Sequence, residues 1–562
     1  MPAGRHLSSR PEQRRKQLLT EPPARKLRRI LTGFVCILLL FLSAFVTKIS
    51  RYSPEERAGT ELIGVIHVHS THSDGGGSFA AIAGKASLAG LDFVVMTDHG
   101  SPTRPEEKPP DSPLFIIGSE VSTDAGHMLA IGNTPPAYEF SPVPDQAVED
   151  IASEGGFSVI AHPFHMKTPW EQWPLPPADG MEVINADSDW RGASWMKIAT
   201  SLPLYWLNPV YFHLKFLHYP TESIRAFDHE AAQRHFLLFA GLDAHARIEL
   251  SQQMVLHIPD YLPLFKTLRI RIPGKVPKTR EAIIAALRHG SFYISIDGIA
   301  SGTGFGFKAL DGKVSYAMGD VVPRGPVRIE ALTEAGCRIR IMRNGIEVAS
   351  GDGRVSFVTI DSGAYRAEVY RPKRSHPFDP NVPWILSNPI FVGAQYADQP
   401  PLSKAPGLAP EKLLFESRRF HAEADYLSRA NYDGSHLHFR IGQSRDPRAW
   451  PVVALCLRTP LQLATSDSFV IRLHSDRIYR IWLQVHQGEM IFRASVKSHV
   501  EASLQVVKMT DLQPVPEMAG RTLDPGKITG IYLVFDRRSV AAGTEGHVWL
   551  ESVGISPTNG AS

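Results

Sequence analysis

Histidine and carboxylate side chains gather where several apolar runs end in the first half of the chain. The stretch GVIHVHSTHSDGGGS, residues 64–78, places His67, His69 and Asp74 after such a run and closes with three glycines. Further candidates follow later runs: His99, Glu120, His127, His162, Asp243 and His245. Because residues i and i+2 of a strand point to the same face, His67 and His69 can reach one ion, and so can Asp243 and His245. Imidazole nitrogens and carboxylate oxygens without a thiolate favour Zn, Mn or Fe, and this many ligands suit two or three divalent ions.

The elements that would carry these residues alternate between strands and helices from residue 61 to residue 300. Strand patterns occupy residues 61–70, 91–100, 114–122, 127–132, 157–165, 180–188 and 235–246, and helical patterns occupy residues 79–90 and 279–290. This alternation predicts an α/β fold with a parallel sheet or barrel. Most of the polar clusters fall where a strand ends, which is the edge at which such folds build their active sites.

The ordered set IHVHSTHSDG, MTDHG, GSEVS, GHMLAIG, IAHPFH and GLDAHA resembles the PHP (polymerase and histidinol phosphatase) family, close to its carbaryl-hydrolase-like branch. The resemblance covers residues 61–300 and implies a distorted barrel of about seven β/α units, with metals at the C-terminal ends of the strands. It implies a first metal held by His67, His69, Glu120 and Asp243. Glu120 would bridge to a second metal, held also by His127 and His162. Asp74, which stands where other members have a histidine, would hold a third metal with His99 and His245.

A metallohydrolase with this ligand set is expected to cut esters. Divalent metals lower the pKa of bound water to about 7, so a hydroxide that bridges two of them can attack phosphorus. Asp98 is expected to orient a ligand histidine. A nearby histidine could protonate the leaving group, and His72, His165 and Arg247 are candidates to orient the substrate. His72 and His165 fit a solvent-facing or substrate-facing position as well as that of a metal ligand. The favoured activity is that of a phosphoesterase with a small phosphorylated substrate.

Other activities stay open on the sequence alone. Related enzymes that cleave carboxylic esters or carbamates use the same metal shell, and a 5′–3′ exonuclease or a nucleotide bisphosphate phosphatase is a further alternative. A surface binding module that has lost catalysis is the alternative from a different class. Charge counts against nucleic acid: residues 1–29 hold nine Arg or Lys and two Glu, and since the whole chain carries +3, the remainder carries −4. A nucleic-acid groove needs a basic surface.

Residues 1–29 are predicted to form a basic cytoplasmic tail, and residues 30–47 a transmembrane signal anchor. Ile30–Val46 has no charged residue, and as a helix it would extend about 25 Å, at the short end for crossing a bilayer. The positive-inside rule then places the rest of the chain in the periplasm, as a single-pass protein of the inner membrane. A cleaved signal peptide is the alternative, but LSAFVTK offers a poor cleavage site. The three cysteines imply no disulfide framework.

The second half of the chain predicts two β-rich domains. Residues 301–395 alternate apolar and polar side chains and resemble an Ig-like β-sandwich, and residues 396–410 form a Pro-rich linker. Residues 411–562 resemble a galactose-binding-like jelly roll. Such folds bind carbohydrate through exposed aromatic side chains, for which Trp450, Trp482 and Trp549 are candidates, although strand aromatics are more often part of the core.

The segment Leu202–Pro220 is aromatic and apolar, with few charges. Three interpretations fit it: a lid over the metals, a patch that rests on the bilayer, or an ordinary buried helix pair. The buried helix pair is the favoured interpretation.

Overall fold

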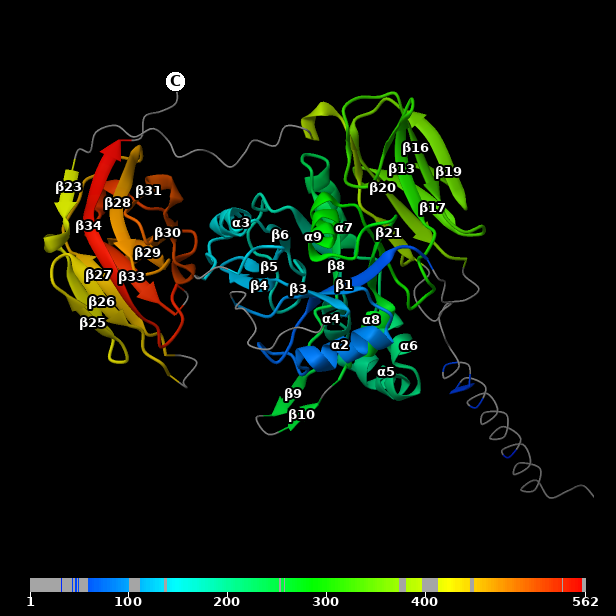
Figure 1. The fold of residues 1–562 in the computed structure, drawn as a ribbon, viewed down its shortest axis with the longest axis horizontal. Helices are drawn as coiled ribbons and strands as arrows, with labels where there is room; N and C mark the ends of the chain where they lie inside the picture. Colours follow the sequence, from blue (N-terminus) through cyan, green and yellow to red (C-terminus); the bar gives the residue numbers. More distant parts are fainter. Residues whose placement is uncertain are drawn as a thin grey trace, which may run out of the picture.

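The computed structural model describes residues 59–100, 112–135, 139–251, 254–256, 258–372, 381–396, 413–444, 449–537 and 539–557, with five isolated positions between residues 32 and 49. Over these residues the fold is mixed α/β, as predicted, and its longer helices all lie before residue 290. Figure 1 shows the blue-to-green barrel region in the middle, a β-sandwich beside it and a yellow-to-red β-rich region on its other side.

The barrel region is built from two sheets. In the first, β1 (Leu62–Val68), β2 (Phe93–Met96) and β3 (Leu114–Ile117) run parallel. The second has the order β4 (Ser119–Thr123), β5 (Gly126–Ile131), β6 (Phe157–Ile160), β7 (Gly180–Asn185) and β8 (Leu237–Gly241). Two isolated bridges, Val68 with Ala244 and His99 with Glu120, join the sheets. These bridges close the barrel at the end of the strands where the predicted ligands lie.

Helices cover the outside of these sheets. They are α2 (Phe79–Leu88), α3 (Pro144–Ser153), α4 (Ala186–Arg191), α5 (Trp195–Leu207), α6 (Pro209–Leu214), α7 (Thr221–Ala231), α8 (Tyr261–Thr267) and α9 (Arg280–His289). The Ser78 side chain caps α2 by accepting a hydrogen bond from the Ala81 N–H, and Gly290 ends α9 in the left-handed conformation. Strict β/α alternation fails at more than one place: only Gly118 separates β3 from β4, β4 and β5 form an antiparallel hairpin, and no helix lies in the described residues 161–179 between β6 and β7.

The predicted β-sandwich region continues the first barrel sheet. β11 (Arg269–Ile272) pairs with β1, β12 (Tyr293–Ser295) pairs with β11, and β21 (Ile385–Ser387) pairs with β12. The same sheet goes on through β20 (Gly363–Tyr370), β22 (Ile390–Val392), β15 (Val321–Val322), β17 (Arg338–Arg343) and β18 (Ile346–Asp352). The opposing sheet holds β13 (Gly306–Asp311), β14 (Val314–Tyr316), β16 (Val327–Leu332) and β19 (Arg354–Thr359). One hydrophobic core therefore extends from Leu62 to Tyr396.

The last region has two six-stranded sheets around a core of its own. One sheet contains β23 (Leu413–Glu416), β25 (Arg429–Tyr432), β26 (His436–Arg440), β28 (Asp467–Ser475), β31 (Ser503–Lys508) and β34 (Glu545–Pro557). The other contains β24 (His421–Ala424), β27 (Val452–Leu457), β29 (Arg480–Gln487), β30 (Met490–Lys497), β32 (Gln513–Pro514) and β33 (Gly530–Asp536). Polar contacts tie the second sheet to the barrel region: Arg480 pairs with Asp150, and Arg493 pairs with Asp124 at 2.5 Å.

The predicted anchor, residues 30–47, lies almost entirely outside the described residues. None of the helices in the described part of the chain is both long and apolar enough to cross a membrane. The anchor and the cellular location inferred from it therefore stay predictions.

Candidate metal centre

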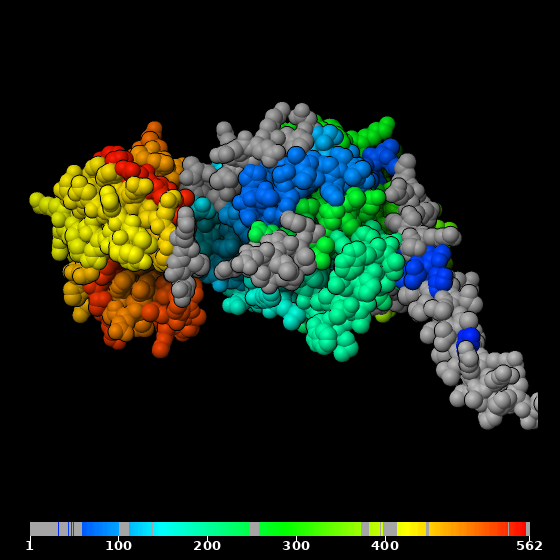
Figure 2. All heavy atoms as spheres, turned by 90° about the horizontal axis from the view of Figure 1, so that it is seen from below, coloured from blue at the N-terminus to red at the C-terminus, as the bar shows by residue number. Residues whose placement is uncertain are grey.

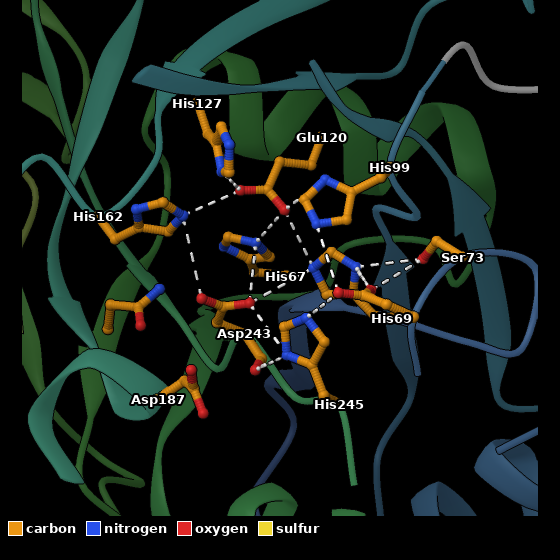
Figure 3. Close-up of polar contacts among 12 residues, drawn as sticks. His67, His69, Ser73, His99, Glu120, His127, His162, Asp187, Asp243 and His245 are labelled. Carbon is orange, nitrogen blue, oxygen red and sulfur yellow. Dashed lines mark hydrogen bonds and ion pairs between the residues drawn. The ribbon is translucent and has the colours of Figure 1, made fainter. Parts of the chain in front are cut away.

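The nine predicted ligands lie together at the closed end of the barrel. They follow or end β1, β2, β6 and β8, and two of them, Glu120 and His127, come from the β4–β5 hairpin. Three of them, His67, His162 and Asp243, have positive φ angles of 64°, 28° and 52°. Such angles strain residues other than glycine, and this kind of strain concentrates at functional sites. Figure 3 shows the side chains converging on one centre.

The first group comprises His67, His69, Glu120 and Asp243, all buried. The Nε2 atoms of His67 and His69 lie 3.3 and 3.2 Å from Glu120 Oε2, and both lie 3.4 Å from Asp243 Oδ1. Four ligands around one Zn ion, each about 2.0–2.2 Å from it, lie about 3.3–3.6 Å from one another. Both Nε2 atoms are buried, and within the described residues neither makes a hydrogen bond. The donor set and its spacing therefore fit a divalent metal.

Glu120 presents its two oxygens to different sets of imidazoles. Oε1 lies 2.8 Å from His127 Nδ1 and 2.9 Å from His162 Nε2. Oε2 faces the first group and lies 3.4 Å from His99 Nδ1. This is the arrangement of a carboxylate that can bridge two ions. His99, Glu120 and His127 form one compact group of possible ligands. His162 is not part of this group and contacts it through Glu120.

The third group lies at the more open side of the centre. Asp74 Oδ2 is 3.1 Å from His245 Nε2 and 3.6 Å from His99 Nε2. His69 joins this group as well, because its Nδ1 lies 3.3 Å from Asp74 Oδ1 and its ring stacks on His245 at 4.2 Å. The geometry therefore differs from the partition implied by the resemblance: His69 faces two groups, one with each ring nitrogen.

Opposite charges keep the central carboxylates ionised. Burial by itself would raise the pKa of Glu120, but His67, His127 and His162 hold it well below its usual range. Burial would likewise raise the pKa of Asp243, which His67, His69 and His245 hold well below its usual range. Ionised carboxylates are the form that binds a metal.

Glu182 is a member of the site that the sequence analysis missed. It lies in the buried strand β7, and its Oε1 is 2.7 Å from His67 Nδ1. Its Oε2 accepts hydrogen bonds from the His162 backbone N–H and from the Asn185 amide, both at 2.9 Å. A Cβ on Gly241 would lie 1.8 Å from Oε1, so the neighbouring strand leaves room for this carboxylate only because it has glycine there. Glu182 therefore fixes the orientation of His67 and the backbone of His162.

Replacing Glu182 with glutamine is expected to weaken metal binding by about 10–100-fold, because a neutral amide no longer makes the His67 ring more basic. The measurement is a titration of metal-free protein with Zn²⁺ or Mn²⁺, with circular dichroism to confirm that the fold is kept. Since Gln keeps the shape of Glu, an affinity equal to that of the unchanged protein would remove Glu182 from the site.

Asp98 acts on a loop rather than on a ligand ring. Its oxygens accept hydrogen bonds from Ser70 N–H at 2.7 Å, Ser70 Oγ–H at 2.8 Å and Ser73 Oγ–H at 2.6 Å. In the described part of the chain these serines, and not a histidine, are its hydrogen-bond partners. Asp98 thereby holds the turn that carries His69 and Asp74.

The other predicted catalytic residues lie at different distances from the centre. His72 is exposed, bonds to Ser70 Oγ at 2.9 Å and rests on the Phe79 ring at 4.7 Å, turned towards α2. His165 is half-buried, and its ring lies 5.3 Å from that of His162. Arg247 is half-buried two residues after His245. Of these three, His165 has the clearest placement beside the ligands.

A groove of about 730 Å³ leads away from the centre. His162, His165 and Glu182 line its inner end, and Lys197, Tyr219 and Arg225 line its outer part. The groove gives a small substrate access to the side of the centre where His162 lies.

The candidate carbohydrate contacts in the last region have different exposures. Trp482 is fully buried, donates a hydrogen bond to Asp536 and packs near Val143 of the barrel region, so it is unable to stack on a sugar. Trp450 is covered on one face by Arg537, 4.2 Å from its ring. Trp549 is half-buried and stacks with His436 at 4.7 Å and with His474 at 5.0 Å. Carbohydrate binding by this region stays a prediction.

Comparisons with known proteins find distant structural neighbours only. No protein-family model matches the chain, and no curated protein matches it. One structural neighbour is a two-domain protein from Bacteroides vulgatus that contains a predicted PHP-like metal-dependent phosphoesterase. It is 14% identical, covers 60% of this chain and 99% of its own, and has a TM-score of 0.29.

Two family 11 carbohydrate-binding modules from Clostridium thermocellum are further structural neighbours. The first, in complex with a mixed-linked tetrasaccharide, is 10% identical and covers 25% of this chain and 89% of its own, with a TM-score of 0.19. The second, from a cellulosomal cellulase, is 11% identical and covers 28% of this chain and 96% of its own, with a TM-score of 0.20. Similarities of this size assign the chain to no family, so membership of the PHP family stays a prediction.

Proposed function

We propose that this protein is a metal-dependent hydrolase, specifically a phosphoesterase, that uses two or three divalent ions of Zn, Mn or Fe. The observation that carries the proposal is the position of the buried Glu120, whose two oxygens face separate sets of imidazoles. The unpartnered Nε2 atoms of His67 and His69 support it, because a buried nitrogen without a hydrogen-bond partner is costly unless a ligand satisfies it.

The metals would supply the chemistry of an activated water and of charge neutralisation on the ester oxygens. The residues of the chain hold the ligands and position the substrate. Glu182 orients His67, and Asp98 holds the turn that carries His69 and Asp74. The acidic body of the chain favours a small substrate over a nucleic acid.

His165 is placed to donate a hydrogen bond to a substrate in the groove. The Thr168 backbone N–H donates to its Nδ1 over 3.2 Å, so the ring carries its proton on Nε2. Burial lowers the pKa of His165 to about 4, which leaves the ring neutral at pH 7. A neutral Nε2–H beside His162 can contact an ester oxygen or the leaving group.

The proposal is tested with p-nitrophenyl phosphate, bis-p-nitrophenyl phosphate and p-nitrophenyl acetate, each with Zn²⁺, Mn²⁺ or Fe²⁺ added to the full chain. We expect metal-dependent cleavage of a phosphate ester and little cleavage of the acetate. Cleavage of the acetate alone would favour the carboxylic-ester or carbamate hydrolase. Protein that binds no metal and cleaves none of the three would favour a non-catalytic binding module.

The membrane anchor and the periplasmic location belong to the proposal as inferences from the sequence. Their support is the uncharged stretch Ile30–Val46 behind a basic tail.

A further inference from the structure

The helix α5, Trp195–Leu207, is apolar and yet exposed. Its sequence, WMKIATSLPLYWL, has one charged residue, and Ser201 is its only buried residue. Trp195, Met196 and Trp206 are 77%, 60% and 70% exposed. A helix that is apolar around its whole circumference is normally buried in a core or in a membrane. The favoured interpretation of this segment as a buried helix pair holds for α6, which buries Phe212, His213 and Leu214. It holds only in part for α5, which packs Ile198, Leu204 and Tyr205 against the cluster of Trp190, Phe212 and Phe216 and leaves its other side exposed.

A second apolar segment lies beside α5. In the loop after β6, Phe164, Met166 and Trp173 are exposed, and the rings of Phe164 and Trp173 stack at 5.8 Å. A Cβ on Gly192 would lie 3.6 Å from Met166 Sδ, so this loop approaches the turn between α4 and α5. We call the exposed side chains of Phe164, Met166, Trp173, Trp195, Met196 and Trp206 the apolar rim.

The apolar rim borders the groove of the metal centre. Phe164, Met166 and the α5 residue Lys197 line this groove, at whose inner end His162 lies. Trp195 and Trp206 are eleven residues apart, which is about three turns, so both project from one side of α5. Contiguous apolar surface of this kind marks a contact with another protein, with a ligand or with a membrane.

The residues before position 50 indicate that the apolar rim contacts a membrane. The Asn208 amide, between α5 and α6, donates a hydrogen bond to the Ile49 carbonyl over 3.1 Å, and Ile49 is almost fully buried. Figure 2 shows the blue atoms of the described positions before residue 50 beside the blue-green surface of α5 and α6. Only two residues separate Ile49 from Val46, the end of the uncharged stretch that begins at Ile30. A stretch able to enter a bilayer is therefore tied directly to the end of α5.

The charged side chains near the apolar rim also fit a contact with a membrane surface. Lys167 follows Met166 and Lys197 follows Met196, and both lysines are exposed; Glu171 is an exposed acidic residue of the same loop. Tryptophan with lysine is the composition of protein surfaces that lie at the membrane–water interface, where the rings enter the headgroup region and the lysines attract anionic lipids. Neither a second copy of this chain nor a soluble partner is indicated by a comparable observation in the described residues.

We propose that α5 and the apolar rim dock on the surface of a phospholipid bilayer that contains anionic lipids. The groove of the metal centre then opens next to the headgroups. This inference concerns the surface and does not depend on hydrolysis. Membrane docking can therefore fail while the proposed activity holds, and the activity can fail while membrane docking holds.

The test uses the full chain in vesicles of phosphatidylcholine and phosphatidylglycerol, with an environment-sensitive fluorophore on one introduced cysteine. Cys36 is first replaced with serine, whereas Cys337 and Cys456 are buried, which raises the pKa of each thiol to about 12 and keeps both unreactive. Met196→Cys places the label on the apolar rim, and Trp206→Cys provides a second position. Ile360→Cys is the control, because Ile360 is an equally exposed apolar residue of the β-sandwich region.

We expect the labels at 196 and 206 to shift to shorter emission wavelength and to be quenched about twofold or more by nitroxide-bearing lipid, since interfacial helices bury about 5–10 Å into the headgroup region. The label at 360 should show neither effect. Four results would overturn the proposal: no association of the chain with the vesicles, water-exposed emission at both 196 and 206, equal quenching at 360, or a wavelength shift without quenching, which would indicate a protein partner.

Discussion

The variant Asp243→Asn is expected to lose metal from the first ligand group and to lose hydrolytic activity by at least about a hundredfold. Asp243 Oδ1 is 3.4 Å from both His67 Nε2 and His69 Nε2, so this carboxylate is shared by the ligands of one ion. Asparagine keeps the size of the side chain and removes its charge. The two imidazoles would then face a neutral amide in a buried site, where the lost charge is poorly replaced by water.

Both metal content and turnover are measured for Asp243→Asn, because the prediction is a loss of each. Metal is measured by elemental analysis after gel filtration, and activity with the substrate that the ester panel identifies. The matched control is Asp179→Asn, because Asp179 precedes β7 at the opposite end of the strands and bonds only to Ser158 among its side-chain hydrogen bonds in the described residues. Full activity and full metal content in Asp243→Asn would discard the site.

Removal of metal by EDTA is expected to abolish activity and to lower the melting temperature of the barrel region by about 10 °C. A ligand present at about a thousand times its Kd stabilises the folded state by about 4 kcal/mol. Without metal, the buried Nε2 atoms of His67 and His69 lose the ion that would bind them. The measurement is calorimetry of the full chain before and after chelation, followed by addition of Zn²⁺ or Mn²⁺.

The Asp243→Asn variant serves as the control for this experiment, since chelation should change its melting temperature much less. Recovery of both activity and melting temperature on adding metal is the expected result. If chelation leaves the unchanged protein with the same melting temperature and activity, structural metal and catalytic metal are both excluded.

The candidate ligands can be picked out from the sequence because each one belongs to a short local pattern. His67 and His69 share a strand end, as do Asp243 and His245, and the fold brings these ends together. Glu182 has no such pattern. It is a single acidic residue in the apolar stretch GMEVIN, and its role depends on the approach of His67 from β1 and of Gly241 from β8. Only the closed barrel reveals that contact.

Pairings between distant segments limit the prediction of the fold in the same way. The change from helical to alternating patterns near residue 301 suggests a separate β-sandwich. No local pattern shows that Tyr293 and Ser387 are partners in one sheet. Likewise, the apolar sequence of α5 predicts a buried helix, but it does not indicate which neighbouring elements will cover that helix.

The continuity of the sheet through β12 and β21 has a consequence for how the molecule denatures. Cutting the chain near residue 300 would leave β12 as an uncovered edge with unpaired backbone groups, a template for aggregation. The barrel and the neighbouring sandwich should therefore melt in one cooperative step, and the jelly-roll-like region, with its independent core, in another.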